Sequence, residues 1–352
     1  MELEGNLMSK TMDYSGETIG KYRLISKIGN GSFGVVYKAL DTVLDVEKAI
    51  KILEVSNPKE ACILFSEASI PYKCTHPNIV KINTGELLEF NGKNVFVVDM
   101  ELINGFSVEE ILKRSETSVV WSISVIRNIL FAVEYSHIQG NIHRDIKPAN
   151  ILIDNGVPKL SDFGLASALG SVIIPWKWYV THAAPETFVD NSTATVQTDI
   201  FALGMTLYRM VNSISDWELF LNSIPNVKKL IVSGKLIDNL PKSQIVPDKV
   251  HRIIRKACNK LPEKRYVSAA QMRNVIEKLS LKYDWKPQDE YHWIGQAIGE
   301  PVKEIYIESK RNYAEVVVTN NSRKSGQDSR KFGNMIEATK YMYEYIKETT
   351  LG

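Results

Sequence analysis

Apolar residues follow two different spacings along the chain, and the change between them divides the sequence. In the first hundred residues they form short strand-like runs, such as residues 83–90 and 95–99, which are joined by the hairpin signal Asn91-Gly92. Later they recur at helical spacing, most clearly over residues 123–138. The pattern therefore predicts a β-rich part followed by a helical part.

These two parts lie between segments of different character. Residues 1–19 are polar and aperiodic, so they predict a loose leader, with regular structure beginning at Tyr22. The β-rich part is assigned to residues 20–103 and the helical part to residues 104–281. Residues 282–301 are rich in Trp, Tyr, Gly and Pro, which is typical of a linker or a docking strip.

The last fifty residues predict a small separate module over residues 302–352. Two apolar runs, residues 304–307 and 314–318, indicate a hairpin, and residues 330–333 indicate a third short strand. A helix is predicted over residues 335–346, because five apolar or aromatic residues share one helical face: Met335, Ala338, Tyr341, Met342 and Tyr345. The module is therefore of β-β-(β)-α type, and it resembles no family.

Composition narrows the class without deciding the function. The chain has 352 residues, and its 44% hydrophobic and 24% charged content is ordinary for a globular protein of two or three domains. A net charge of +2 favours neither nucleic acid nor an acidic partner. Charged residues interrupt the first ten positions, so no signal peptide is predicted, and no apolar run is long enough to cross a bilayer.

Cysteine usage points to a reducing compartment. Cys62, Cys74 and Cys258 are an odd number without Cys-x-x-Cys spacing, which disfavours a disulfide framework and a zinc site. A cytoplasmic location is the simplest expectation.

The richest candidate chemistry lies in residues 143–150, which read His-Arg-Asp-Ile-Lys-Pro-Ala-Asn. The stretch follows a helix-like apolar segment and precedes a short β-rich run, and such a loop holds reactive side chains on a rigid scaffold. Asp145 is suited to accept a proton from a hydroxyl nucleophile, and Lys147 to neutralise phosphate charge. Asn150 carries a carbonyl oxygen suited to Mg²⁺.

A second candidate is the glycine pattern Gly29-x-Gly31-x-x-Gly34 between two strand-like runs. Glycines let backbone N–H groups approach phosphates closely. A strand follows the pattern here, which disfavours a dinucleotide site and favours a lid over phosphates.

Together these stretches resemble eukaryotic-type serine/threonine protein kinases. Residues 143–150 resemble the catalytic loop of that family, and the other motifs occur in the family's order over residues 20–281. The matching stretches are the glycine pattern, Ala49-Ile50-Lys51, Asp162-Phe163-Gly164, Ala184-Pro185-Glu186, and Asp199 with Gly204. Lys147 two positions after Asp145 resembles the Ser/Thr branch of the family. The implied activity is transfer of the ATP γ-phosphate to protein hydroxyls, with autophosphorylation.

The resemblance implies a role for each matching residue. Asp145 orients the hydroxyl, Lys147 steadies the moving phosphoryl group, and Asn150 with Asp162 holds Mg²⁺, with Mn²⁺ as the alternative metal. Met100 becomes the gatekeeper of the adenine pocket. The residues expected to bind ATP are Ile28, Gly29, Gly31, Gly34, Val36, Ala49, Lys51, Met100, Glu101, Ile103 and Leu152.

Lys51 lies in an apolar strand and needs a carboxylate partner. Glu67, on the helix-like segment 61–74, stands at the family's position for that partner, and Glu60 is the weaker alternative. Pro71 departs from the family, because inside a helix its ring would crowd the carbonyl of residue 67 at a cost of roughly 3 kcal/mol. The helix is therefore expected to end or bend there.

The segment 165–183 corresponds to the family's activation segment, and its sequence is unusual. Arg144 implies a pocket for a phosphorylated loop, yet few acceptors are present. The candidates are Ser167, Ser171, Tyr179 and Thr181. Glu186 needs a basic partner, and Arg265 fits the family's position.

The sequence thus predicts an α+β, bilobal protein-kinase-like fold with the small C-terminal module. Pro71 and the unusual activation segment leave a pseudokinase or nucleotide-binding scaffold as the alternative, whereas a small-molecule kinase is disfavoured by Glu186 with Arg265. Partners are expected to be protein substrates, with a protein docking on the module or activation segment. The basic loop 320–331 makes nucleic acid a lesser alternative, and no membrane is expected.

Overall fold

The computed structural model describes residues 13–31, 34–55, 75–162, 182–188 and 194–352. The chain divides into two compact units. The first comprises residues 1–107, 132–145 and 150–179, and the second comprises residues 108–131, 146–149 and 180–352.

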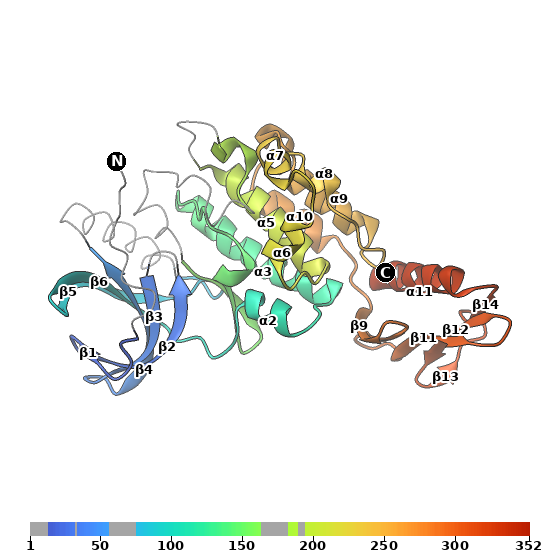
Figure 1. Cartoon of the computed structure of the whole chain (residues 1–352), viewed down its shortest axis with the longest axis horizontal. Coiled ribbons are helices and arrows are strands. Elements are labelled where there is room, and N and C mark those ends of the chain that lie inside the picture. Colours follow the sequence, from blue (N-terminus) through green and yellow to red (C-terminus); the bar gives the residue numbers. More distant parts are fainter. Residues whose placement is uncertain (1–12, 32–33, 56–74, 163–181, 189–193) are drawn as a thin grey trace. The chain divides into compact units, whose positions relative to one another are not determined.

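A six-stranded antiparallel sheet forms most of the first unit, with strand order β1-β2-β3-β4-β6-β5 (Figure 1). Asn91 and Gly92 both have positive φ angles, 52° and 72°, so they form the tight turn that the hairpin signal predicted. The strands are β1 Thr18–Ile19, β2 Tyr22–Gly31, β3 Gly34–Asp41, β4 Val46–Glu54, β5 Ile82–Phe90 and β6 Lys93–Met100.

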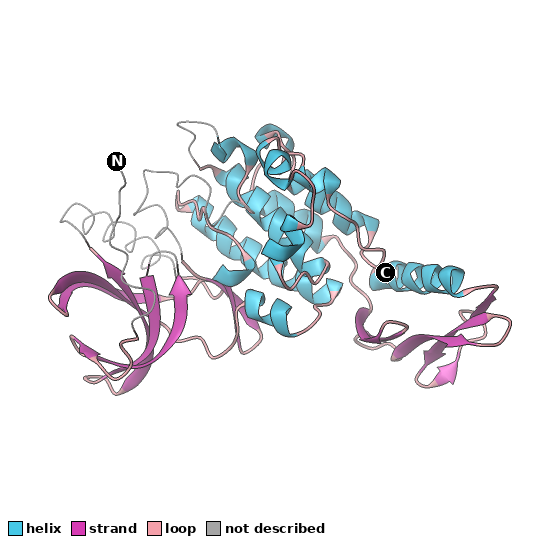
Figure 2. Cartoon of the chain, in the orientation of Figure 1, coloured by secondary structure: helices cyan, strands magenta, loops and turns pink. Residues whose placement is uncertain are grey.

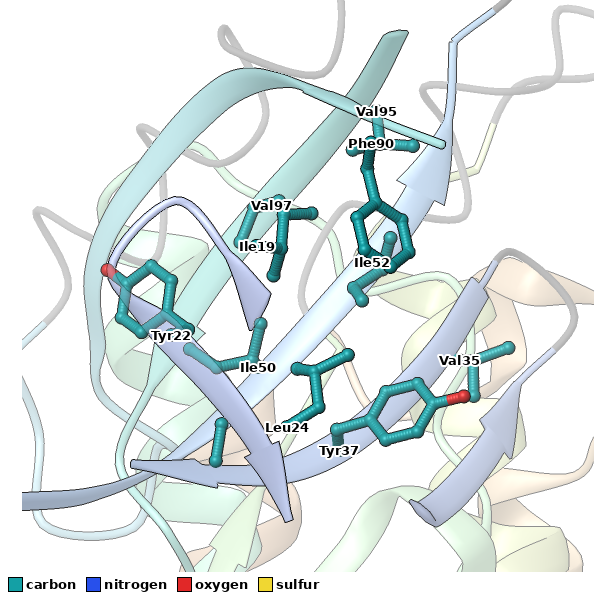
Figure 3. Close-up of a cluster of buried hydrophobic side chains, with 11 residues drawn as sticks. Ile19, Tyr22, Leu24, Val35, Tyr37, Ile50, Ile52, Phe90, Val95 and Val97 are labelled. Carbon is teal, nitrogen blue, oxygen red and sulfur yellow. The ribbon is translucent and has the colours of Figure 1, made fainter. Parts of the chain in front are cut away.

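The core of this sheet is built by strict alternation. Along β3 every second residue is buried, so Val35 and Tyr37 point into a cluster that also holds Ile50 and Phe90 (Figure 3). Ile19 is 1% exposed and belongs to the same cluster. Regular structure therefore begins earlier than the predicted Tyr22, at β1. Burying the apolar side chain of Ile19 stabilises this strand, whereas a solvated polar leader would gain no such hydrophobic free energy.

A helix and a hairpin flank the loop of residues 143–150, which the sequence analysis singled out. Helix α3, Val119–Ile138, is followed by the loop, by the single turn η1 Pro148–Asn150, and by the hairpin of β7 Ile151–Asp154 and β8 Val157–Leu160. By length and hydropathy α3 could cross a membrane, contrary to the expectation from sequence, but 56% of its apolar window is buried inside the protein. It therefore has the burial of a core helix.

Helices dominate the second unit up to residue 277 (Figure 2). Helix α5, Val196–Val211, is buried on all sides from Thr198 onward, which marks it as the central helix of this unit. The other helical elements of this part of the chain are α2 Val108–Arg114, η2 Pro185–Phe188, α6 Trp217–Asn222, α7 Val227–Val232, α8 Leu236–Asn239, α9 Asp248–Ala257, η3 Pro262–Lys264 and α10 Ala269–Glu277. Of these, α9, η3 and α10 pack against α5.

A second sheet ends the chain, with order β13-β12-β11-β10-β9 and β14 beside β12. Helix α11, Met335–Thr350, packs on it, and Asn334 caps that helix by accepting a bond from the Glu337 N–H at 2.9 Å. The strands are β9 Asp284–Asp289, β10 His292–Gln296, β11 Lys303–Ser309, β12 Ala314–Asn320, β13 Arg323–Lys324 and β14 Arg330–Phe332. The predicted hairpin, third strand and helix are confirmed.

The linker predicted at residues 282–301 was wrong, because this stretch supplies β9 and β10. Trp285 and Trp293 fill the core beneath α11, and Gly295 lies directly opposite Trp285. A Cβ at Gly295 would come within 2.8 Å of the indole ring, so glycine is required for the ring to pack there. The aromatic and glycine content that resembled a linker is therefore that of a packed sheet.

The terminal module is continuous with the helical part of the second unit. Ile245 packs against its core, the Lys347 ammonium lies 2.9 Å from the Asp248 carboxylate, and Leu281 pairs with Leu351. The module therefore belongs to the same compact unit as the helical part.

Candidate active site

His143 holds the catalytic loop in place. Its ring is 1% exposed, its Nε2 lies 2.9 Å from the Ser161 carbonyl oxygen, and its Nδ1 accepts the Asp145 N–H at 3.2 Å. Because Nδ1 accepts, Nε2 carries the proton and donates it to Ser161. The His143 ring thus links the backbone of Asp145 to that of Ser161, the residue before Asp162. The sequence analysis assigned no role to His143. Its place at the start of the stretch 143–150 was the one feature that could have indicated a role.

Asp145 and Asn150 are brought together as predicted. The Asn150 amide nitrogen donates to the Asp145 carbonyl oxygen at 2.8 Å and to its carboxylate Oδ2 at 2.9 Å. Both amide hydrogens are thereby used, so the side-chain carbonyl oxygen of Asn150 is the atom left for a cation. Asn150 is 6% exposed, so this orientation is well supported by packing.

Two residues of the site adopt left-handed backbone conformations. Arg144 has a φ angle of 72° and Asp162 one of 60°. Such conformations cost non-glycine residues of the order of 1–3 kcal/mol each, and they concentrate where function requires a fixed side chain. The structure thus holds the backbone beside Asp145, and at Asp162 itself, in conformations that non-glycine residues adopt less often.

Lys51 is buried on β4 and is paired with Asp162. Its side chain is 4% exposed, and its Nζ lies 2.6 Å from the Asp162 Oδ1. The predicted need for a carboxylate is therefore met by Asp162 in this structure. Glu67, the partner expected from sequence, lies outside the described residues, as do Glu60 and Pro71.

A cluster of apolar residues, here called the apolar wall, includes residues of the strand that carries Lys51. Ala49 and Met100 face each other across β4 and β6, and they cluster with Val36, Ile103 and Leu152. The Glu101 N–H already donates to the Lys81 carbonyl at 3.0 Å, which leaves the Glu101 carbonyl for a ligand.

The predicted glycines lie at the facing ends of β2 and β3. Gly31 pairs with Gly34 and Gly29 with Val36, while Ile28 is 50% exposed on β2. The two residues at the tip, 32 and 33, lie outside the described part of the chain.

In the second unit, Glu186 and Arg265 form the predicted pair. The guanidinium donates two bonds to the carboxylate, at 2.6 and 2.7 Å, and the Arg265 side chain is 0% exposed. Further bonds run from Arg265 to the carbonyls of Asn259 and Gln197. Asp199, also predicted, is fully buried on α5, and Lys147 belongs to this unit as well.

Comparison with known proteins decides the family. The sequence pattern described as "Protein kinase domain" matches residues 22–275. The chain belongs to the protein kinase family. It is 34% identical over 275 residues to serine/threonine-protein kinase PrkC of Bacillus subtilis, covering 73% of this chain and 40% of that relative. It is 31% identical over 266 residues to probable serine/threonine-protein kinase PknB of Lactococcus lactis, covering 73% and 41%. The chain thus spans about two fifths of the length of these curated relatives.

The fold agrees with this assignment. The Mycobacterium tuberculosis PknI kinase domain superposes on 75% of this chain and 98% of its own, with a TM-score of 0.55 and 17% sequence identity. The first unit of the kinase chain carries the β-rich lobe and the second carries the helical lobe with its additional sheet and helix.

The Glu186–Arg265 pair yields a stability prediction for this kinase fold. Replacing Glu186 with Gln leaves the buried Arg265 charge without its carboxylate, which is expected to lower the free energy of unfolding by roughly 3 kcal/mol. Urea unfolding, monitored by circular dichroism, measures this change in the free energy of unfolding. Glu277→Gln is the matched control, because its bond to Arg273 at 2.7 Å is more exposed and is worth less than about 1 kcal/mol. Equal losses in the two variants would contradict the assignment.

His182 was missed by sequence reasoning, since a histidine between a threonine and an alanine gives no signal of its own. It is buried, with its ring centroid 5.5 Å from that of Trp217. Burial lowers its pKa from 6.5 to about 3, with the charges of Arg209 and Lys147 adding to the effect. The imidazole of His182 is therefore neutral at physiological pH.

This histidine predicts a pH dependence of stability. Because the folded pKa lies below the unfolded value, the unfolded chain binds a proton that the folded chain excludes. The free energy of unfolding should fall as pH drops below 6.5, by about 2 kcal/mol at pH 5. His182→Gln should lose that part of the slope in urea unfolding at a series of pH values. His251, whose pKa burial also lowers, stays in both proteins, so an identical slope in the two would disprove the role of His182.

Proposed function

We propose that this chain transfers the γ-phosphate of ATP to serine and threonine hydroxyls of proteins, its own included. The observation that carries the proposal is the grouping in one unit of a buried lysine paired to Asp162 and of Asp145 held by Asn150. That grouping provides a cation for phosphate, a carboxylate for a hydroxyl proton, and oxygen donors for a metal.

The oxygen donors at this site fit Mg²⁺, with Mn²⁺ as the alternative. Asp162 offers a carboxylate and Asn150 offers its remaining carbonyl oxygen. Within the described residues no group of three or more His, Cys, Asp or Glu gathers, so the other ligands would be phosphate oxygens and water, as is usual for Mg²⁺ with ATP. Bound there, the metal would neutralise charge on the phosphates.

The other steps of the reaction are assigned to side chains of the protein itself. Asp145 accepts a hydrogen bond, and then the proton, from the acceptor hydroxyl, and its carboxylate is oriented by the Asn150 amide at 2.9 Å. Lys51 places a buried positive charge at the phosphates, where the low exposure of its side chain strengthens the attraction. Ala49, Met100 and Leu152 form the apolar wall against the adenine.

A non-catalytic scaffold would be the alternative, but no observation favours it. The groups that transfer would use are present on four residues, with Lys51 paired to Asp162 and Asp145 bonded by Asn150. The residues that suggested the alternative, Pro71 and the activation segment, lie outside the described part of the chain.

The test is transfer of label from γ-labelled ATP with Mg²⁺ to peptides that carry Ser, Thr or Tyr as the sole acceptor. We expect label on the Ser and Thr peptides that is lost when the metal is chelated. Label confined to Tyr peptides would overturn the assignment to the Ser/Thr class. Tight binding of ATP without label on any peptide or on the protein would favour the scaffold.

A further inference from the structure

Lys159 on β8 lies between two carboxylates. Its Nζ is 2.6 Å from the Glu101 Oε2 and 3.6 Å from the Asp154 Oδ2, and its side chain is 15% exposed. None of the roles assigned above uses Lys159. A largely buried lysine held by two acidic groups has a fixed position, unlike a solvated surface lysine.

Both carboxylates also accept backbone N–H groups, and Glu101 itself lies in the hinge, the segment 100–107 that leaves β6. The other oxygen of Glu101 accepts the Lys81 N–H at 2.7 Å, and Asp154 accepts the Asn104 N–H at 3.4 Å. The Lys159 ammonium therefore joins β8 to Glu101 in the hinge and to Asp154 at the end of β7, whose carboxylate accepts the Asn104 N–H of the hinge.

The hinge also lies directly on the backbone of β7. The Ile153 N–H donates to the Phe106 carbonyl at 2.9 Å. A Cβ on Gly105 would come within 1.9 Å of the Ile153 carbonyl oxygen, so only glycine permits this approach. The hinge and the β7–β8 hairpin are thus in contact along the segment that Lys159 ties down.

The same hairpin carries both proposed metal-binding residues at its base. Asn150 directly precedes β7, Asp162 follows β8 by two residues, and the Ser161 N–H donates to the Asn150 carbonyl at 2.9 Å. Leu152 pairs with Lys159 across the hairpin and packs in the apolar wall beside Met100. One rigid hairpin therefore links the adenine side of the site to the metal side.

We propose that Lys159 is a positioning residue that sets the distance between the adenine site at the hinge and the metal site at Asn150 and Asp162. The proposal rests on the proposed function, because it assumes that ATP and Mg²⁺ bind at this site. When the Lys159–Glu101 pair is broken, the hairpin can shift against the hinge. The adenine site and the metal site then no longer lie at the separation that lets one nucleotide bind both in good geometry.

The test compares nucleotide affinity with and without metal in the full chain. The probe is adenylyl imidodiphosphate, titrated calorimetrically in Mg²⁺ and again in EDTA, with adenosine as the probe of the adenine site alone. Lys159→Met is expected to reduce the gain in affinity that Mg²⁺ provides by about 10-fold, the scale of effects for residues that orient metal ligands. The affinity of Lys159→Met for adenosine should stay within twofold of the wild-type affinity. Lys159→Arg keeps the positive charge and should keep most of the affinity gain that Mg²⁺ provides.

Lys38→Met is the matched control, because Lys38 on β3 forms an ion pair with Glu47 at 2.7 Å away from the hinge. Glu101→Gln is a second variant that removes the charge and keeps the side-chain shape, should Lys159→Met fold poorly. An unchanged Mg²⁺ gain in Lys159→Met or in Glu101→Gln would overturn the proposal, as would an equal loss in Lys38→Met. A wild-type chain that shows the Mg²⁺ gain but transfers no phosphate would defeat the proposed function alone.

Discussion

Asp145→Asn is expected to reduce phosphate transfer by about 10²- to 10⁴-fold, the usual contribution of a positioned general base. The amide has almost the same shape as the carboxylate, and its oxygen can still accept the bond that Asn150 donates at 2.9 Å. What it cannot do is accept a proton from the acceptor hydroxyl. The loss should therefore appear in kcat, while the affinity for ATP changes little.

Steady-state kinetics on a Ser or Thr peptide, together with calorimetric titration of ATP, separate these two quantities. Asp238→Asn is the matched control, because Asp238 is an exposed carboxylate that bonds Arg255 at 3.1 Å on the second unit. It should retain full activity. A variant at Asp145 with more than a tenth of the wild-type kcat would show that Asp145 is not the base.

Asp162→Asn is expected to have the second-largest effect, a loss of roughly 10²- to 10³-fold in transfer, because it removes charge that the reacting phosphates need balanced. It should also weaken the dependence of nucleotide affinity on Mg²⁺. Stability should fall too, since Lys51 with its 4% exposed side chain would keep its charge and lose the carboxylate 2.6 Å away.

The double variant Lys51→Met with Asp162→Asn separates the two consequences. Removing the charge of Lys51 also removes the cost of leaving it unpaired, so thermal unfolding of the double variant should occur at a higher temperature than that of Asp162→Asn alone. Transfer should remain lost in both. If the double variant is less stable than the single one, the ion pair is not what holds Lys51 in place.

Local signals in the sequence predicted the features that depend on local chemistry. Asn91-Gly92 predicted a hairpin, because a tight turn depends on the residues at its own positions. The loop from His143 to Asn150 was recognisable because its reactive residues lie within eight positions. The pairing of Glu186 with Arg265 followed from the resemblance to kinases.

Pairings across long distances in the chain could not be found in this way. Lys51 and Asp162 are separated by 111 positions, and Lys159 and Glu101 by 58, and no spacing rule connects them. The strands β9 and β10 were missed for a related reason, because Trp285 is recognisable as a core residue only once α11 lies over it. The burial of His182 likewise depends on Trp217, which lies 35 positions later in the chain.

The most direct test of the central claim is the mass of the wild-type chain after incubation with ATP and Mg²⁺, with Asp145→Asn treated in parallel. Mass spectrometry of proteolytic peptides then locates each added phosphate. We expect phosphate on Ser or Thr residues of the wild-type chain and none on the variant. Equal phosphorylation of the two proteins, or an unmodified wild-type chain that also leaves Ser and Thr peptides unlabelled, would contradict it.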